Sequence, residues 1–523
     1  MDAVLEKTLE KAWNSSCKVI FGKELSGNLA AYRKWLCRDI PKPTKRKSHE
    51  SGHELDLAVD AYPKSARFVS EAELKPNRDY SLSINDIKDM DSIARALSEK
   101  CEYTGSRFLG NSAHVEGSDI VMDSQYVNNS TNVEESTYVD SSFMIRKGSK
   151  YVFGSGYLAK SEFVLRVIGA FNSKRCFECC FVLDSSDAYF SHACFGSQNI
   201  MFCFGQRNVS YRIGNLQLPK DAYVKLKEKL LSEVCEELER KKEYPLLREL
   251  VPDVTPKPVP DIVMPAKRAA GSMAPMEKGF ASTCNVLFRK NIGGIEKFEK
   301  WLSENTVQIA SATSAFGTKN LYPLGHSSIS NFPMKRRVSY EESIACGSLH
   351  LEEKDVASLE GIIAGLGKIG YFTSEMDYGK NSNYIDSPLV YHGSNVYKMY
   401  DITYGENAAV SFLALNSKYV YGCRRILESQ FSVKCYNSLY LNRCFELDSC
   451  NKCSDSYFCH NSEALQDCMF CFNMKGRRHC IGNTQLEREE YAKAKDALVG
   501  QMADELMKTG RLNLNIYNIG AKQ

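Results

Sequence analysis

Residues 420–444 read VYGCRRILESQFSVKCYNSLYLNRC, in which every third residue, counted from Val420, is small or apolar. The same lane of third positions extends from Tyr384 to Met474 without a charge, an amide, a histidine or a proline. Because 25% of the chain is charged, chance alone rarely leaves so long a lane uncharged. We therefore predict that the lane faces the interior of the fold.

An earlier tract carries a stricter form of this pattern. From Ser112 to Ser142 a serine recurs at every sixth position, a valine stands midway between successive serines, and Ile145 continues the series. A one-residue slip near Gly154 restarts the lane at Ser155, and the lane then continues to Cys203. The slip predicts a bulge or a corner at this point.

A period of three fits neither a flat strand, which repeats every two residues, nor an α-helix, which repeats every 3.6. Long 3₁₀ helices are weakly bonded, and collagen requires glycine at every third place. A parallel β-solenoid remains, in which short strands joined by corners stack equivalent residues into inward columns. In architecture alone, residues 110–206 and 380–475 therefore resemble β-solenoid proteins. The hexapeptide acyltransferases are excluded, because their small residue stands two places before the aliphatic one rather than three.

The chain contains two similar halves. Residues 149–223 align without gaps with residues 417–491, and MFCF recurs at 201–204 and 469–472. The alignment predicts an α+β protein made of two tandem copies of one unit: N-terminal helices, a parallel β-solenoid and a capping C-terminal helix. The N-terminal region either caps the first coil or is the surface through which the copies meet. The predicted boundaries are a first unit 1–251 (helical and mixed region 1–109, solenoid 110–215, capping helix 216–242), a Pro-rich linker 252–277, and a second unit 278–523 (278–378, 379–483 and 484–510 in the same order).

Composition restricts the class of protein. A chain of 523 residues predicts two or more domains, and a net charge of +3 favours neither nucleic acid nor membrane as a general partner. We find no apolar run long enough for a membrane span, and the first residues form a charged amphipathic pattern rather than a signal peptide. We predict a cytoplasmic protein. Its 20 cysteines are then expected to be reduced thiols within the core.

Four cysteines have the spacing of a structural zinc site, C-x2-C followed later by C-x2-C: Cys450, Cys453, Cys468 and Cys471. If one coil held about eighteen residues, the two pairs would stack and their thiolates would converge. The matching places in the first copy hold Val182, Ser185, Ile200 and Cys203. We therefore predict packed core thiols and no cofactor, with zinc as the alternative.

Two acids and a histidine recur in both copies, as Glu178 and Glu446, Asp187 and Asp455, and His192 and His460. Such a set is sufficient for general acid–base catalysis or for a metal site with two carboxylates and one imidazole. None lies on the apolar lane, so we expect these residues at corners or facing outward. The alternative to a catalytic role is that the acids cap turns and the histidine covers an apolar edge.

Basic triplets also recur before the two tracts, as Lys45, Arg46 and Lys47 and as Lys335, Arg336 and Arg337. Cations near serine residues suit the phosphates of a nucleic acid or another acidic partner. Three adjacent cations in a solvated loop are the alternative interpretation.

The sequence shows no P-loop, no Rossmann glycine fingerprint, no H-E-x-x-H and no nucleophile elbow. We predict a non-enzymatic structural protein that self-assembles into a homo-oligomeric shell, filament or scaffold. One alternative is a transferase or hydrolase with an acid and histidine site on the flank of the solenoid. The other is a zinc- or nucleic-acid-binding module.

Overall fold

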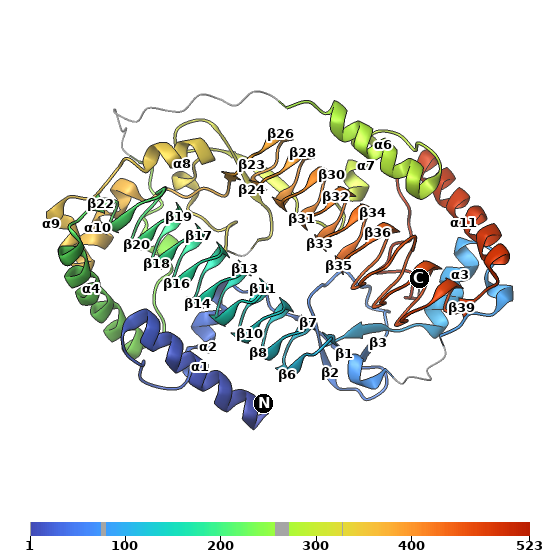
Figure 1. The fold of residues 1–523 in the computed structure, drawn as a ribbon, viewed down its shortest axis with the longest axis horizontal. Coiled ribbons are helices and arrows are strands. Elements are labelled where there is room, and N and C mark those ends of the chain that lie inside the picture. Colours follow the sequence, from blue (N-terminus) through green and yellow to red (C-terminus); the bar gives the residue numbers. More distant parts are fainter. Residues whose placement is uncertain (1, 75–79, 257–270, 327, 523) are drawn as a thin grey trace.

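The computed structural model of the protein describes residues 2–74, 80–256, 271–326 and 328–522. Two stacks of short parallel strands lie side by side, and helices line the outside of both (Figure 1). The predicted solenoid-like arrangement of parallel strands in a mixed α/β fold is therefore confirmed. Residues 257–270, the central part of the Pro-rich linker, lie outside the described residues.

The first stack consists of two facing sheets. One sheet contains β6 Ala113–Glu116, β8 Gln125–Asn128, β10 Thr137–Asp140, β12 Lys150–Phe153, β14 Glu162–Leu165, β16 Lys174–Phe177, β18 Ser186–Tyr189, β20 Gln198–Met201, β21 Ser210–Ile213 and the antiparallel β22 Leu216–Gln217. The other contains β5 Phe108–Leu109, β7 Asp119–Met122, β9 Thr131–Glu134, β11 Phe143–Arg146, β13 Gly156–Ala159, β15 Ile168–Phe171, β17 Cys180–Leu183 and β19 His192–Phe195.

The second stack repeats this arrangement. One sheet contains β25 Met376–Tyr378, β27 Leu389–Tyr391, β29 Tyr400–Thr403, β31 Phe412–Leu415, β33 Arg424–Leu427 and β35 Tyr436–Leu439. The other contains β26 Ser382–Ile385, β28 Ser394–Tyr397, β30 Glu406–Ala409, β32 Lys418–Tyr421, β34 Gln430–Val433 and β36 Asn442–Phe445. A last sheet follows, with β37 Gln466–Met469, β38 Arg478–Ile481 and the antiparallel β39 Thr484–Gln485.

One coil of the stack contains 12 residues. Val127 pairs with Val115 on one side and with Val139 on the other, and all the valines of this column from Val127 onward are fully buried. The residue before almost every lane position has a positive φ, as at Tyr126 (55°) and Asn129 (46°). The chain thus turns at every third residue, and each coil has four short sides with one inward side chain apiece. This geometry explains the period of three.

Serine suits the corner columns because it completes the backbone hydrogen bonding there. The Ser130 amide donates to Ser118 Oγ of the preceding coil at 3.0 Å, and Ser130 Oγ donates to the Asn128 carbonyl at 2.7 Å. A buried amide without a partner is destabilising, so an inward hydroxyl stabilises each corner. Cysteine occupies the same column, where Cys179 Sγ accepts the Ser191 amide at 3.4 Å.

The slip in the pattern lies at Lys147 and Gly148, upstream of the predicted place near Gly154. Both residues have positive φ, 52° and 79°, and Thr137 pairs with Lys150, one residue further than the usual register. Gly148 is thus an extra corner residue. Gly154 has a different role, because a Cβ there would lie 2.9 Å from the Leu36 carbonyl oxygen of the adjacent helix.

The helices are α1 Ala3–Phe21, α2 Leu29–Leu36, α3 Met90–Lys100, α4 Lys220–Lys241, α5 Leu247–Leu250, α6 Ala274–Phe288, α7 Ile295–Leu302, α8 Tyr340–Cys346, α9 Glu353–Val356, α10 Leu359–Ile369 and α11 Arg488–Thr509. Helix α1 lies along the first stack and α6 along the second. In α1, Leu5, Leu9 and Trp13 recur at helical spacing and are fully buried. Of the helices described, none combines the length and hydrophobicity that crossing a bilayer requires.

The segment before each stack packs against the other stack. The Leu82 amide donates to the Gly482 carbonyl of the second stack at 2.8 Å, and the Leu351 amide donates to the Gly214 carbonyl of the first at 2.9 Å. Gly214 and Gly482 are matching positions in the two halves. The exchanged segments contain β1 Thr44–Lys47, β2 Glu54–Leu57, β3 Phe68–Ser70 and β4 Tyr103–Gly105 on one side, and β23 Ile309–Thr313 and β24 Lys319–Pro323 on the other.

Candidate functional site

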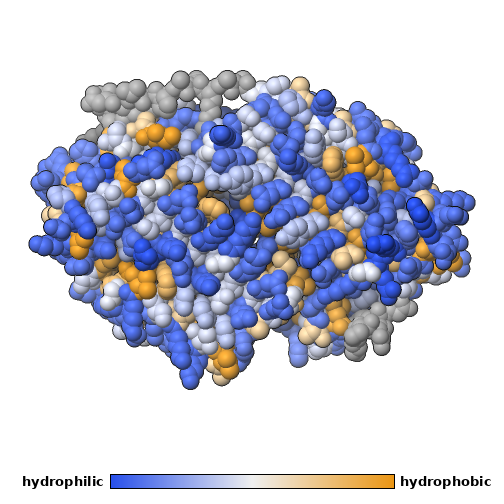
Figure 2. Space-filling view, in the orientation of Figure 1, coloured by the Kyte–Doolittle hydropathy of each residue, from blue (hydrophilic) through white to orange (hydrophobic). Residues whose placement is uncertain are grey.

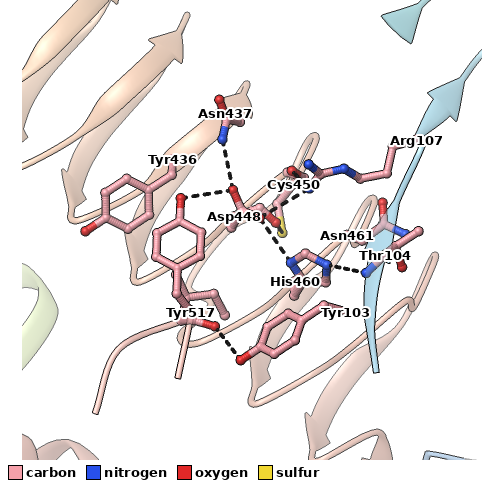
Figure 3. A network of polar contacts seen from close by, with 12 residues as sticks. Tyr103, Thr104, Arg107, Tyr436, Asn437, Asp448, Cys450, His460, Asn461 and Tyr517 are labelled. Atoms are coloured by element: carbon pink, nitrogen blue, oxygen red, sulfur yellow. Dashed lines mark hydrogen bonds and ion pairs between the residues drawn. The ribbon is translucent and has the colours of Figure 1, made fainter. Parts of the chain in front are cut away.

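A buried polar network lies where β4 meets the second stack (Figure 3). The Arg107 side chain donates two hydrogen bonds to Asp119, at 2.9 and 2.6 Å, and its Nη1 lies 3.3 Å from Asp448 Oδ2. All three side chains are fully buried. Asp448 also accepts hydrogen bonds from Tyr62 at 3.0 Å and from Asn437 at 3.1 Å. The carboxylate therefore joins segments that are far apart in the sequence.

His460, one of the predicted catalytic candidates, belongs to this network. Its Nδ1 lies 3.1 Å from Asp448, and its Nε2 accepts the Thr104 amide of β4 at 3.0 Å. Burial lowers the pKa of His460, although the carboxylate of Asp448 opposes this effect. Burial alone would raise the pKa of Asp448, but hydrogen bonding to His460 and the charge of Arg107 hold that pKa well below its usual range. The lone pair of His460 Nε2 thus accepts a hydrogen bond from a backbone amide.

His192 makes the same contact in the first stack. Its Nε2 accepts the Thr373 amide at 3.0 Å, and Phe332 and Phe372 pack around the ring. Burial lowers the pKa of His192 to about 3. The position that matches Asp448 is Cys180, so this histidine has no carboxylate partner there. Both histidines therefore fasten an exchanged segment to the opposite stack.

The predicted glutamates bind the segments that follow the long helices α4 and α11. Glu178 accepts the Leu247 amide at 3.1 Å and the Arg166 Nε at 2.9 Å. Glu446 accepts the Ile516 amide at 2.9 Å. Burial raises the pKa of both carboxyl groups, that of Glu446 to about 7. Each glutamate is buried against the backbone that it binds.

The predicted aspartates form ion pairs between neighbouring coils. Asp187 lies 2.7 Å from Arg175, and Asp455 lies 2.5 Å from Arg443. Within the described residues, the hydrogen bonds and ion pairs of Glu178, Asp187 and His192 lead to different partners. The structure thus gives these residues separate structural contacts.

The 12-residue coil corrects the stacking expected for the zinc-like cysteines. With this coil length Cys468 pairs with Cys480, and the Cys450 amide donates to Ser438 Oγ at 3.0 Å, so the assumption of eighteen residues is wrong. Cys450 Sγ donates to the carbonyls of Asp448 and Cys459. Burial raises the pKa of Cys450 and of Cys471. No three potential metal ligands cluster together among the residues described, and every cysteine is a free thiol.

The basic triplets are largely used in internal contacts. Lys45 lies 2.6 Å from Asp56, and Arg46 lies 3.4 Å from Asp60. Arg336 and Arg337 are buried and donate to backbone carbonyls. Lys47 and Lys335 are exposed. An acidic partner at these triplets remains a prediction that concerns mainly the two exposed lysines.

When the extra residue Gly148 is left out of the alignment of the halves, Arg107 matches Met376 and Asp448 matches Cys180. Neither match is charged, so the comparison of the two halves did not indicate Arg107 or Asp448. Only pairing information between distant segments would have found them. Comparison of the chain with models of protein families, with curated proteins and with solved structures found no match.

Proposed function

We propose that this is a non-enzymatic structural protein of the cytoplasm, which assembles with copies of itself into a shell, filament or scaffold. In this proposal the chain consists of two tandem copies of one unit, and α4 and α11 close the ends of the two solenoids. The free thiols throughout the chain suit a reducing compartment.

One observation carries the proposal: the histidines and glutamates that recur in both halves bind backbone amides of other segments. His192 and His460 bind the amides of exchanged segments, and Glu178 and Glu446 bind the segments after the closing helices. A general base must be able to reach a substrate proton, whereas these groups are buried and bonded to backbone. Their use in both halves favours a role in rigidity.

The reciprocal contacts support the duplicated unit. Leu82 with Gly482 and Leu351 with Gly214 are equivalent pairs in which each half contacts the other. Two identical subunits in an isologous dimer contact each other in the same way. We infer that one chain reproduces, in covalent form, a symmetric pair of units.

The terminal strands β6 and β26, each at one edge of a sheet in its stack, are the surfaces that we propose for assembly. Among the described strands, β6 and β26 each pair with one neighbour, β8 and β28. A strand with an unpaired edge is a template for another strand. On the face shown in Figure 2, hydrophobic residues occur in small groups separated by hydrophilic ones, which favours the edges over an apolar patch there.

The test is light scattering with electron microscopy over a range of concentrations. We expect particles whose mass is a multiple of 58.9 kDa. Ala113→Lys and Ser382→Lys place a charge on the exposed part of β6 and β26 and should shift the particles toward monomers. Gln125→Lys is the matched control, because Gln125 is also exposed but lies on β8, which is paired on both sides. A monodisperse monomer at every concentration contradicts the assembly.

A further inference from the structure

A pocket of about 280 Å³ lies between the facing sheets of the two stacks, away from the network around Asp448. Strands β13, β15 and β17 line it on one side, and β27, β29 and β31 line it on the other. Its walls are mainly apolar and include six aromatic residues, Tyr157, Phe171, Phe181, Tyr391, Tyr400 and Tyr404. Pockets that bind small molecules have this character, with apolar walls and a few polar groups.

Arg146 is the polar group that distinguishes this pocket. Its side chain lines the cavity and the residue is only 7% exposed, yet Nε and Nη1 are buried without a hydrogen-bond partner among the described residues. The Tyr400 hydroxyl, on the opposite wall, is also buried and has no hydrogen-bond partner among the described residues. A buried donor without an acceptor is destabilising, and a guanidinium remains charged in a protein. An anionic oxygen in the pocket would satisfy these donors.

The other charges that line the pocket add to this preference. Lys147 and Lys160 lie at the pocket, whereas Asp401 is the one carboxylate in its wall. Among the neighbouring acids, Glu134 lies 3.2 Å from Arg425, and Glu428 lies 4.0 Å from Lys147 and partly balances the charge of that lysine. The carboxylate of Asp401 acts on the charge of Arg146. The lining holds three cations and one carboxylate, and one positive charge remains when Glu428 is also counted.

The fold itself does not require these cations. With the extra residue Gly148 left out of the alignment, Arg146 matches Leu415 of the second half, and Lys160 matches Glu428. The same backbone therefore accommodates leucine where the first half places a buried arginine. A residue that breaks a local rule without a structural gain marks a functional position.

We propose that this pocket binds a small amphipathic anion, with its apolar body against the aromatic walls and its carboxylate-like group on Arg146. Binding at this site would be additional to the structural role and independent of self-assembly. A carboxylate accepts charge-assisted hydrogen bonds from a guanidinium, and these are the stronger kind.

Calorimetric titration of the whole protein with decanoate, and with decanol as the uncharged comparison, tests the proposal. We expect saturable decanoate binding that is at least tenfold tighter than decanol binding. Arg146→Leu introduces the residue of the matching position, so it should retain the fold and weaken decanoate binding at least tenfold without changing decanol binding. Lys174→Leu, which removes an exposed cation outside the pocket, should bind decanoate like the natural protein.

A second variant approaches the pocket from the opposite stack. Thr403→Trp fills part of the cavity and should abolish binding of both compounds while the thermal midpoint stays within a few degrees. The proposal is overturned if decanoate does not saturate, if decanol binds equally well, or if either pocket variant binds decanoate as the natural protein does.

Discussion

At each end of the interface between the stacks, a histidine of one stack binds a backbone amide of the segment before the other stack, but the side chains around the histidine differ. At one end the Thr104 amide donates to His460, and at the other the Thr373 amide donates to His192, each at 3.0 Å. Behind His460 lies the charged cluster of Arg107 and Asp448. The matching residues behind His192 are Met376 and Cys180, among phenylalanine rings. The hydrogen bond from a backbone amide to an imidazole is therefore common to both ends. The residues that surround the imidazole are charged at one end and mainly apolar at the other.

The largest expected effect comes from breaking the charged end. Arg107→Met introduces the residue of the other end but leaves Asp119 and Asp448 buried without their cation. Removing one partner of a buried ion pair destabilises a protein by about 3–5 kcal/mol. We expect a loss of this size in the free energy of unfolding, measured by urea denaturation followed by circular dichroism.

The control adds the second residue of the apolar end. In the double variant Arg107→Met with Asp448→Cys, one of the two stranded carboxylates is also removed. Its loss of stability should be smaller than the sum of the two single losses, because residues in one network are coupled by about 0.5–3 kcal/mol. Additive losses would show that Arg107 and Asp448 do not act as a unit.

The period of three was sufficient to predict the inward lane and the parallel stacking, because the same constraint recurs at Val127, Val133, Val139 and every later coil. It was not sufficient to predict the coil length, since any multiple of three keeps the lane intact. The hydrogen bonds between the histidines and the exchanged segments could not be predicted from the sequence either. Thr104 and His460 lie 356 residues apart, and nothing local to either residue indicates that the segment before one stack packs on the other.

The polar candidates show the same limit at the level of single residues. Glu178 and His192 recur in the second half, and in both halves the recurring residue accepts a backbone amide. Whether the role of these residues is catalytic or structural depends on burial and on the backbone amide each one binds. Both depend on the tertiary fold, which the pattern of residue types does not reveal.

A smaller effect should appear in the pH dependence of the two histidines. Burial lowers the folded-state pKa of His192 to about 3 from its ordinary value of 6.5. The unfolded chain then binds the proton more readily, so this histidine's contribution to stability is complete above pH 6.5 and falls as the pH decreases toward 3. From pH 7.5 to 5.5 the natural protein should lose about 1.4 kcal/mol relative to His192→Leu.

Urea unfolding of both proteins at several pH values provides the measurement, and the difference between them cancels the other titrating groups. His460→Leu should show a smaller relative change, because Asp448 opposes the lowering of the His460 pKa. Parallel pH profiles for His192→Leu and the natural protein would show that His192 does not have to become charged when the chain unfolds.

The smallest effect is expected where the halves exchange hydroxyl for thiol. Ser155 and Cys423 are matching corner residues: Ser155 Oγ accepts the Val167 amide at 3.0 Å, and Cys423 Sγ accepts the Cys435 amide at 3.4 Å. Because serine and cysteine both occur in this column in each half, Ser155→Cys and Cys423→Ser should each change the free energy of unfolding by less than about 1 kcal/mol. Ser155→Ala leaves the Val167 amide without a partner and should cost about 1–3 kcal/mol in the same urea assay. If the two swaps cost as much stability as Ser155→Ala, the size of the side chain would decide which residue fits at this corner. The hydrogen-bond acceptor would then not explain why serine and cysteine occur there.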